Sequence, residues 1–250
     1  MSTKIDPVHQ FQIHEIVNLN LMGVDISITN QSIWMLGIIG TLSLVLLIAS
    51  TRLKTVPGRG QAMLEMVHDL ILGTLKDSAG AKGVKYMPFI FTLFLFLLVI
   101  NLAGMVPGSF TSTSQIYITG FMSFFIFLSV IVIGFATHGL KFLKLFTPAG
   151  IPMWMMPFIV VLEVLSFFVR PFTLAIRLCA NMMAGHIVVK LFAYFITMML
   201  GSGILVGIFS VLPFAGLIGI TALEVFVAAM QAYIFTLLTC VYLNDALNMH

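Results

Sequence analysis

Charged residues are scarce in this sequence. Only 8% of its 250 residues are Asp, Glu, Lys or Arg, whereas 60% are hydrophobic, and the mean hydropathy is +1.12. Soluble domains carry about 25% charged residues, so this class of protein is excluded. The 12 Lys and Arg residues form no dense basic run, which argues against a nucleic-acid partner despite the net charge of +3. The chain is therefore predicted to be an integral membrane protein.

Cysteine is almost absent as well. Cys179 and Cys240 lie far apart in apolar stretches, so the sequence offers neither a disulfide framework nor the ligand spacing of a zinc site. It also has no glycine-rich phosphate loop, and no nucleophile can be paired with a base. We therefore expect no metal, no cofactor and no bond-making chemistry in this chain.

Long apolar runs are what the sequence does have. Residues 33–50, 88–106 and 116–137 are predicted transmembrane helices, since even the shortest would reach about 27 Å across a core of ~30 Å. Residues 1–32 lack the basic-then-apolar order of a cleaved signal peptide and are predicted to stay as an external segment. Residues 61–76 place apolar and charged side chains at helical spacing, which predicts an amphipathic helix on the membrane surface.

The basic residues indicate the orientation in the membrane. Half of them fall between the first two spans: Arg52, Lys54, Arg59, Lys76, Lys82 and Lys85. The positive-inside rule places this segment in the cytoplasm and the N-terminus outside. The uncharged loop before Gln115 suits the external side. With two further long helices to come, the C-terminus is predicted to be cytoplasmic.

The last hundred residues form two runs too long for upright spans. A continuous helix over residues 152–200 would reach about 75 Å, so it is either two spans broken near Pro171 or one long, steeply tilted helix. Residues 204–243 form a second run after Gly201-Ser202-Gly203. The fold class is therefore predicted as all-α, with transmembrane helices, one surface helix and a long C-terminal helical hairpin.

Ionisable residues follow one stripe of the first run. Glu163, Arg170 and Arg177 are spaced by seven residues, and Asn181 follows one turn later. An arginine at mid-membrane costs about 2.5–3.5 kcal/mol on insertion scales, so Arg177, the deepest, is predicted to be functional. Arg170 and Glu163 have an alternative reading, in which they form a structural ion pair or extend to an interface.

Further candidate residues lie on another face of the first run and on the second run. His186 lies nine residues beyond Arg177, about 180° around the helix, and Glu224 and Gln231 are one heptad apart on the second run. An imidazole and a carboxylate on two helices that pack together predict an aqueous proton path. The alternatives are a buried, hydrogen-bonded histidine and a carboxylate that is simply paired or hydrated.

Several motifs together resemble the a subunits of rotary F-type ATP synthases. They are Arg170-Pro171, Ile176-Arg177-Leu178, Ala180-Asn181-Met182, Ala184-Gly185-His186, the run from Gln231 to Leu238, and Asn101 to Pro107. The resemblance covers essentially the whole chain. It implies a tilted hairpin that faces a rotating ring of c subunits, with two offset half-channels, b and b′ stator subunits, and the rest of the synthase as partners.

The resemblance also implies roles for the candidate residues. Arg177 matches the essential arginine, a permanent cation that would lower the pKa of an approaching ring carboxylate and block a proton leak. Asn181 and Gln231 match polar residues near that arginine, and Glu163 matches an acid of a channel. The chain itself would be a non-catalytic, proton-conducting subunit.

One departure from many bacterial members is informative. They carry an acid at the position of His186 and a histidine at that of Glu224, so the two residues are exchanged here, as in alphaproteobacterial and mitochondrial members. This exchange predicts that the two side chains are neighbours in one half-channel. It also predicts location in a bacterial inner membrane, with a mitochondrial inner membrane as the alternative.

Other functions stay open at this stage. A sodium-coupled member of the same family is the main alternative, because the ring largely selects the ion. A proton-coupled secondary transporter would show similar halves, and residues 1–125 do not resemble residues 126–250.

Overall fold

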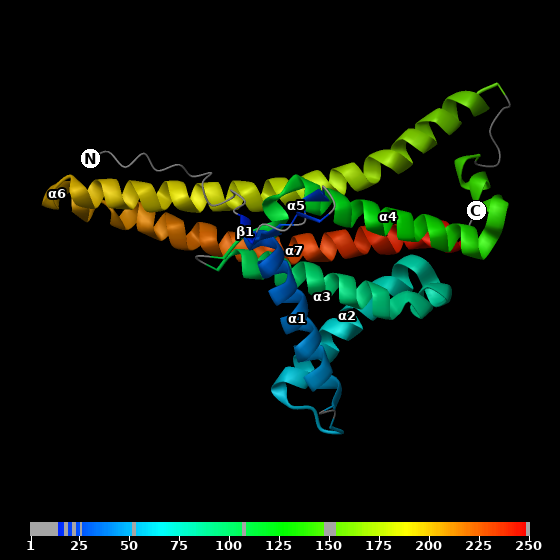
Figure 1. Cartoon of the computed structure of the whole chain (residues 1–250), viewed down its shortest axis with the longest axis horizontal. Coiled ribbons are helices and arrows are strands. Elements are labelled where there is room, and N and C mark those ends of the chain that lie inside the picture. Colours follow the sequence, from blue (N-terminus) through cyan, green and yellow to red (C-terminus); the bar gives the residue numbers. More distant parts are fainter. Residues whose placement is uncertain are drawn as a thin grey trace.

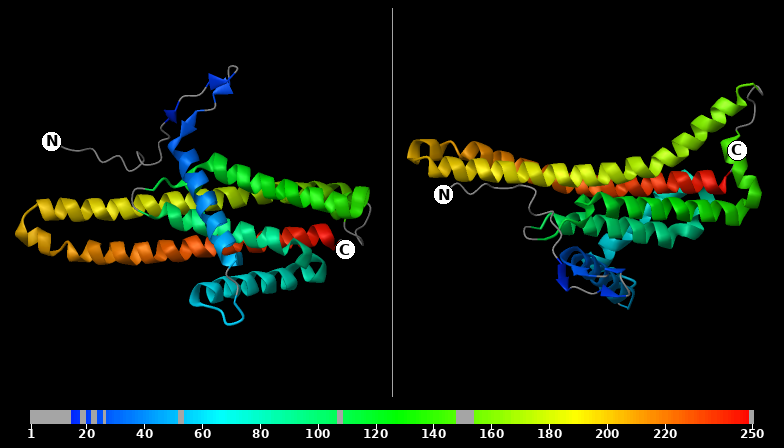
Figure 2. Two further views of the ribbon diagram at one scale, coloured as in Figure 1. Left: turned by 60° about the horizontal axis from the view of Figure 1, so that its bottom comes forward. Right: turned by 45° about the horizontal axis from the view of Figure 1, so that its top comes forward.

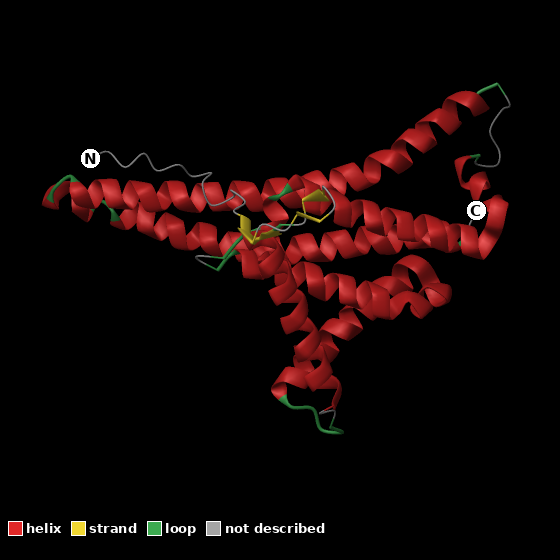
Figure 3. Ribbon diagram, in the orientation of Figure 1, coloured by secondary structure: helices red, strands yellow, loops and turns green. Residues whose placement is uncertain are grey.

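The structure, a computed structural model, is helical almost throughout (Figure 3). It describes residues 15–17, 20–21, 24–25, 27–51, 54–106, 109–147 and 154–248. Within these residues, five helical stretches are long and apolar enough to cross a membrane: Asn30–Thr51, Arg59–Gly104, Ile116–Leu143, Met156–Gly201 and Val206–Leu247. The predicted all-α membrane fold is confirmed. The first 14 residues of the predicted external segment, and the start of the 152–200 run, lie outside the described residues.

Short strands precede the first helix. β1 (Glu15–Val17) pairs antiparallel with β4 (Ile28–Thr29), and β2 (Asn20–Leu21) pairs antiparallel with β3 (Val24–Asp25). The sequence analysis predicted no strands here. Ladders of two or three residues carry too little hydrophobic alternation to be recognised. They lead directly into α1 (Asn30–Thr51).

The next helices double back on each other. α2 (Arg59–Gly83) is followed by a 3₁₀ turn, η2 (Val84–Tyr86), and by α3 (Met87–Gly104). α2 is longer than the predicted surface helix over residues 61–76, and its backbone is interrupted at Gly80, whose φ of 66° favours glycine. Ile71 and Leu75 are fully buried in the main core. Part of the apolar surface of α2 therefore packs on its own chain, whereas Met63, Met66 and Leu70 stay exposed. The place of α2 at the membrane surface stays a prediction.

A loop and a turn bracket the fourth helix. η3 (Ser112–Ser114) leads into α4 (Ile116–His138), and η4 (Gly139–Phe146) follows. η4 folds back on α4 because Gly134 has no side chain: a Cβ there would lie 2.4 Å from the Phe142 ring. Nε2 of His138 lies 3.1 Å from the carbonyl oxygen of Leu247, which ties α4 to the C-terminal end of the chain.

The first long run is a single helix. α5 (Met156–Gly201) has 46 residues and contains Pro171 in its interior. Of the two alternatives, one continuous helix and two spans broken near Pro171, the structure has the first. Figure 1 shows α5 changing direction in its N-terminal half, which contains this proline. A proline removes one main-chain hydrogen bond and bends a helix without ending it.

The second run, predicted as a hairpin helix over residues 204–243, is interrupted near its start. α6 (Ile204–Ile208) is separated from α7 (Val211–Leu247), which also continues four residues beyond the predicted end. Pro213 lies just after the interruption, in the first turn of α7, where the missing N–H of a proline costs no helical hydrogen bond. Gly203, with a φ of 114°, provides the turn between the two runs.

α7 lies at the centre of the molecule, in contact with α2, α3, α4 and α5. Figures 1 and 2 show α5 and α7 running antiparallel, joined at α6, with α1 crossing them steeply. A helix as long as α5, about 69 Å, fits within a membrane core of ~30 Å only when strongly inclined. The tilt of this hairpin in a bilayer stays a prediction that its length supports.

Candidate functional site

Arg177 lies on the side of α5 that the rest of the chain leaves open. The side chains of Leu174 and Leu178 point into the core and are 2% and 0% exposed, whereas Arg177 and Ile176 are exposed. Among the described residues, no carboxylate oxygen lies within 4.0 Å of the Arg177 guanidinium. A guanidinium at membrane depth needs an anionic or hydrated partner. Such a partner has to come from outside this part of the chain.

An amide pair lies one helical turn beyond the arginine. The side-chain nitrogen Nδ2 of Asn181 donates a hydrogen bond to Oε1 of Gln231, at 3.2 Å. Gln231 is 3% exposed and belongs to α7, so this bond links the open face of α5 to the central helix. The structure therefore brings Asn181 and Gln231 together, as two of the candidates from the sequence.

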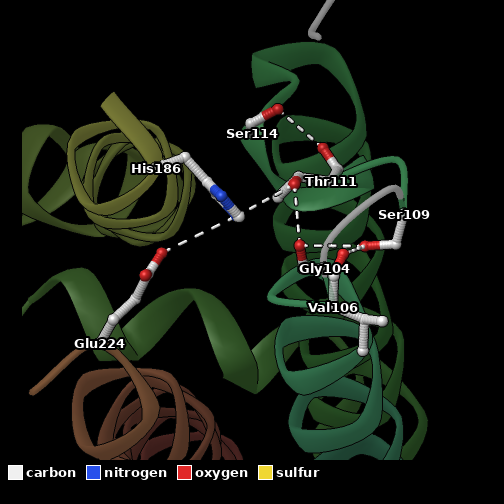
Figure 4. Close-up of polar contacts among 7 residues, drawn as sticks. All are labelled: Gly104, Val106, Ser109, Thr111, Ser114, His186 and Glu224. Atoms are coloured by element: carbon white, nitrogen blue, oxygen red, sulfur yellow. Dashed lines mark hydrogen bonds and ion pairs between the residues drawn. The ribbon is translucent and has the colours of Figure 1, made fainter. Parts of the chain in front are cut away.

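His186 and Glu224 face each other across the hairpin. Nε2 of His186 on α5 lies 3.8 Å from Oε1 of Glu224 on α7, and both side chains are largely buried (Figure 4). The proximity predicted from the exchange of these two residues is confirmed. This separation is longer than a hydrogen bond, so a proton passes between the two groups only through a bridging water or after they move closer.

The close approach of Glu224 depends on Gly185. A Cβ atom at position 185 would lie 2.6 Å from Oε1 and 2.9 Å from Cδ of Glu224. Real Cβ atoms do not approach oxygen so closely, so any larger residue would push the carboxylate away from its present place. Gly185 thus creates the space in which the pair forms. Sequence reasoning assigned it no role.

A third residue, Thr111, joins this pair from the loop after α3. Its Oγ1 lies 3.0 Å from Nε2 of His186 and 3.1 Å from the carbonyl oxygen of Gly104 (Figure 4). Thr111 is 3% exposed. Thr111 was not among the residues predicted from the sequence, because it lies in an uncharged loop that suited an external connection. The hydroxyl-rich run from Thr111 to Ser114 was the available signal.

Buried polar atoms without a hydrogen-bond partner in the chain gather near this triad and Gln231. In the described residues they are Asn101 Oδ1, Ser112 Oγ, Thr113 Oγ1, Glu224 Oε1 and Gln231 Nε2. Buried polar atoms of this kind are ordinarily satisfied by water. On α3, η3 and α7 these atoms leave hydrogen-bonding capacity unused in the protein interior.

Arg170 has a different partner from the one predicted. Its Nη1 lies 2.9 Å from Oδ2 of Asp245 near the end of α7, so the ion pair suggested with Glu163 is wrong. The guanidinium also lies over the ring of Tyr242, at 5.1 Å from the centroid. Arg170 is therefore held by α7, which supports a structural role. Asp245 lay beyond the predicted end of the helix and was not considered.

Glu163 is separate from these groups. It is partly exposed on the N-terminal arm of α5, 14 residues or about 21 Å along the helix from Arg177. His186 lies nine residues from Arg177 in the opposite direction, which is about 14 Å. Arg177 thus stands between two groups of ionisable side chains on one helix.

Comparisons with known proteins indicate the family to which the chain belongs. A profile of the ATP synthase A chain matches residues 32–244. The chain is 46% identical to ATP synthase subunit a of Bartonella bacilliformis over 243 residues, which cover 97% of this chain and 96% of the relative. It is 44% identical to that of Rhodospirillum rubrum over 244 residues (98% and 99%), and to that of Methylobacterium sp. over 249 residues (99% of each).

The family match includes the candidate residues from Thr111 to Gln231 and ends one residue before Asp245. The relatives are alphaproteobacterial, in line with the group suggested by the exchange of His186 and Glu224. Because the family match covers most of the chain and these relatives are at least 44% identical to it, the chain belongs to the ATP synthase A chain family.

Proposed function

We propose that Arg177 and the two polar groups on either side of it carry the proton translocation that this family performs in ATP synthase. As a member of the ATP synthase A chain family, the chain is a non-catalytic, proton-translocating subunit of the membrane sector. The observation that carries the proposal for the residues is the position of Arg177. It is an exposed cation without an anionic partner among the described residues, between two sets of ionisable groups.

The partner of Arg177 is proposed to be a carboxylate of the c-subunit ring. A guanidinium stays protonated at any physiological pH, so it favours the ionised form of a carboxyl group that approaches it. The ring carboxyl would release its proton on reaching Arg177 and take up another after leaving it. The open face of α5 then faces the ring, and the b and b′ subunits would hold the chain against rotation.

The two polar groups are proposed to belong to separate half-channels. With the N-terminus outside, the chain crosses the membrane so that η3 and the turn at α6 are external and the start of α5 is cytoplasmic. The His186–Glu224 pair, which contacts η3, then belongs to the external half-channel. Glu163, toward the opposite end of α5, belongs to the cytoplasmic one. Asn181 and Gln231 would line the passage near Arg177.

The coupling ion is proposed to be the proton. His186 supports this choice over sodium, because an imidazole exchanges protons near neutral pH, whereas sodium sites are built from oxygen ligands. The location is proposed to be the plasma membrane of a bacterium, since the relatives are bacterial.

Removal of the cation tests this function directly. In the assembled synthase, Arg177→Ala should abolish ATP-driven acidification of inverted membrane vesicles, measured with a pH-sensitive dye at equal amounts of assembled complex. Lys54→Ala, which removes an exposed cation from the loop before α2, is the matched control and should pump normally. Normal acidification by the Arg177 variant would contradict the proposal.

A further inference from the structure

Two aromatic rings and one carboxylate surround the guanidinium of Arg170. Its Cζ atom lies 5.1 Å from the centroid of the Tyr242 ring and 5.9 Å from that of the Phe167 ring, and Nη1 lies 2.9 Å from Oδ2 of Asp245. A cation within about 6 Å of an aromatic centroid is attracted to the face of the ring. Three side chains therefore hold this arginine, and two of them belong to the end of α7.

The carboxylate alone would hold Arg170 only weakly. Both side chains of the ion pair are partly exposed, by 28% and 29%, and water weakens the attraction between charges at such a site. A ring beside the guanidinium adds an attraction to its flat face and limits where this flat group can lie. The position of Arg170 therefore depends on an aromatic ring as well as on Asp245.

Tyr242 provides the ring that can tie Arg170 to another helix. Phe167 lies three residues before Arg170 on α5, so it moves with the arginine and cannot hold it against a neighbour. Tyr242 belongs to α7 and packs against both the main core and the smaller cluster around Phe127 and Ala246. Its hydroxyl makes no hydrogen bond to another residue in the described part of the chain. What Tyr242 offers to Arg170 is therefore the ring.

A released Arg170 would reach toward the space beside Arg177. The two residues are seven positions apart, close to two full turns, so they start from the same side of α5, about 10 Å from each other. The phenol group of Tyr242 interacts electrostatically with both arginines, which places Tyr242 within range of each. An arginine side chain is long and has many rotamers. The direction that Arg170 takes is thus decided by its partners on α7.

We propose that Tyr242 is a positioning residue that keeps the guanidinium of Arg170 against α7, so that ring carboxylates approach Arg177 without meeting a second guanidinium. The inference rests on the proposed function, since it concerns the cation that a ring carboxylate meets. A carboxylate near two cations holds its ionised form more strongly than a carboxylate near one. A released Arg170 therefore delays the uptake of the next proton by the ring, and rotation slows.

Substitutions that keep or remove the aromatic ring test this inference. The measurement is ATP-driven proton pumping by inverted vesicles, at equal amounts of assembled synthase. Tyr242→Phe keeps the ring and should pump at close to the wild-type rate. Tyr242→Leu and Tyr242→Met fill much of the space without a ring, and both should pump several-fold more slowly. Equal rates in the phenylalanine variant and the two aliphatic variants would overturn the inference.

Removal of Arg170 separates positioning from a general loosening of the helices. If the defect comes from a released cation, Arg170→Gln removes its cause, so the double variant of Tyr242→Leu and Arg170→Gln should pump faster than Tyr242→Leu alone. Loosened packing would gain nothing from a second change at the same contact. A double variant no faster than Tyr242→Leu therefore contradicts the role of Tyr242.

Tyr233 provides the matched control. It is also a partly buried tyrosine of α7 packed against the main core, but its hydroxyl lies 3.5 Å from that of Thr74. Arg170→Gln should therefore bring no gain in pumping to Tyr233→Leu. An equal gain in both leucine variants would show that Arg170→Gln acts independently of the Tyr242 ring, and the inference would be lost.

The proposed function fails by a different result. If Arg177→Ala pumps protons at the normal rate, the arginine has no part in translocation, whatever the Tyr242 variants do. If Arg177→Ala is inactive and Tyr242→Leu pumps at the normal rate, the proposed function stands and only the role of Tyr242 is overturned.

Discussion

The guanidinium of Arg170 is bound to the carboxylate of Asp245, with 2.9 Å between Nη1 and Oδ2. Arg177 lies seven residues further along the same helix, about 10 Å away, and has no such partner among the described residues. The two arginines are therefore not equivalent. Asp245 and the ring of Tyr242 hold one of them, and the other stays exposed on α5.

Asp245→Asn should therefore slow ATP-driven proton pumping, because the released Arg170 would become a second free cation near Arg177. Loss of a charge-assisted hydrogen bond costs about 1.5–3 kcal/mol, and the partial exposure of both side chains, 28% and 29%, favours the lower end. The measurement is the pumping rate per assembled complex. Asp69→Asn on the exposed face of α2 serves as the control.

A second substitution makes this prediction sharper. Combining Asp245→Asn with Arg170→Gln removes both charges and should recover part of the lost rate, since no unbalanced cation remains. A double variant slower than Asp245→Asn alone would show that the free charge is not the cause of the defect.

Arg177→Lys should be severely impaired although it keeps a positive charge. An ammonium loses its proton more readily than a guanidinium in a poorly hydrated site, and it lacks the planar fork that binds a carboxylate through two hydrogen bonds. The pumping rate in inverted vesicles, compared with that of Arg177→Ala, measures the effect. Coupling at the wild-type level would show that charge alone suffices.

Exchanging the members of the buried pair should be better tolerated than changing one. His186→Glu places two carboxylates together, and Glu224→His places two imidazoles together, whereas the double variant restores one of each at these two neighbouring positions. We therefore expect the double variant to pump faster than either single variant, as a coupled pair does in a double-mutant cycle. If it is as slow as the worse single variant, the two side chains do not act together.

Gly185→Ala should disturb the pair without removing a polar group. The added methyl group would stand 2.6 Å from the Glu224 carboxylate and force it to move, and overpacking of this kind costs about 1–3 kcal/mol. We expect a several-fold slower pumping rate. Gly120→Ala is the matched control, because a Cβ there meets no atom within 4 Å. Equal rates in the two variants would mean that the site tolerates displacement of Glu224.

The site residues that could be predicted from the sequence are those whose side chains are costly to place in lipid. Arg177, His186 and Glu224 each interrupt a long apolar run, and the free-energy cost of an ionisable group in a membrane is what marks them as candidates. Thr111 and Asp245 gave no such signal. A threonine in an uncharged loop costs nothing there, and an aspartate near the end of a helix is ordinary.

The long helices, too, were partly predictable from the sequence and partly decided by the tertiary structure. Hydropathy predicted that residues 152–200 form helix but left open whether Pro171 divides them, because a proline bends some helices and ends others. In the structure, packing against a neighbouring helix supports a continuous helix at Pro171. Pro171 is buried, and Ser123 of α4 donates a hydrogen bond to its carbonyl oxygen at 2.7 Å, so the neighbouring helix supports the chain at this point.

By itself, then, the sequence determined that the protein is helical, lies in a membrane and carries a costly arginine, since all three follow from local composition and from the absence of water in a bilayer core. Tertiary structure alone decided which polar groups meet. It paired Arg170 with Asp245, separated by 75 positions, and joined Thr111 to His186 over the same separation. Contacts of this kind depend on how helices pack, and the periodicity of a helix does not show which side chain of another helix it meets.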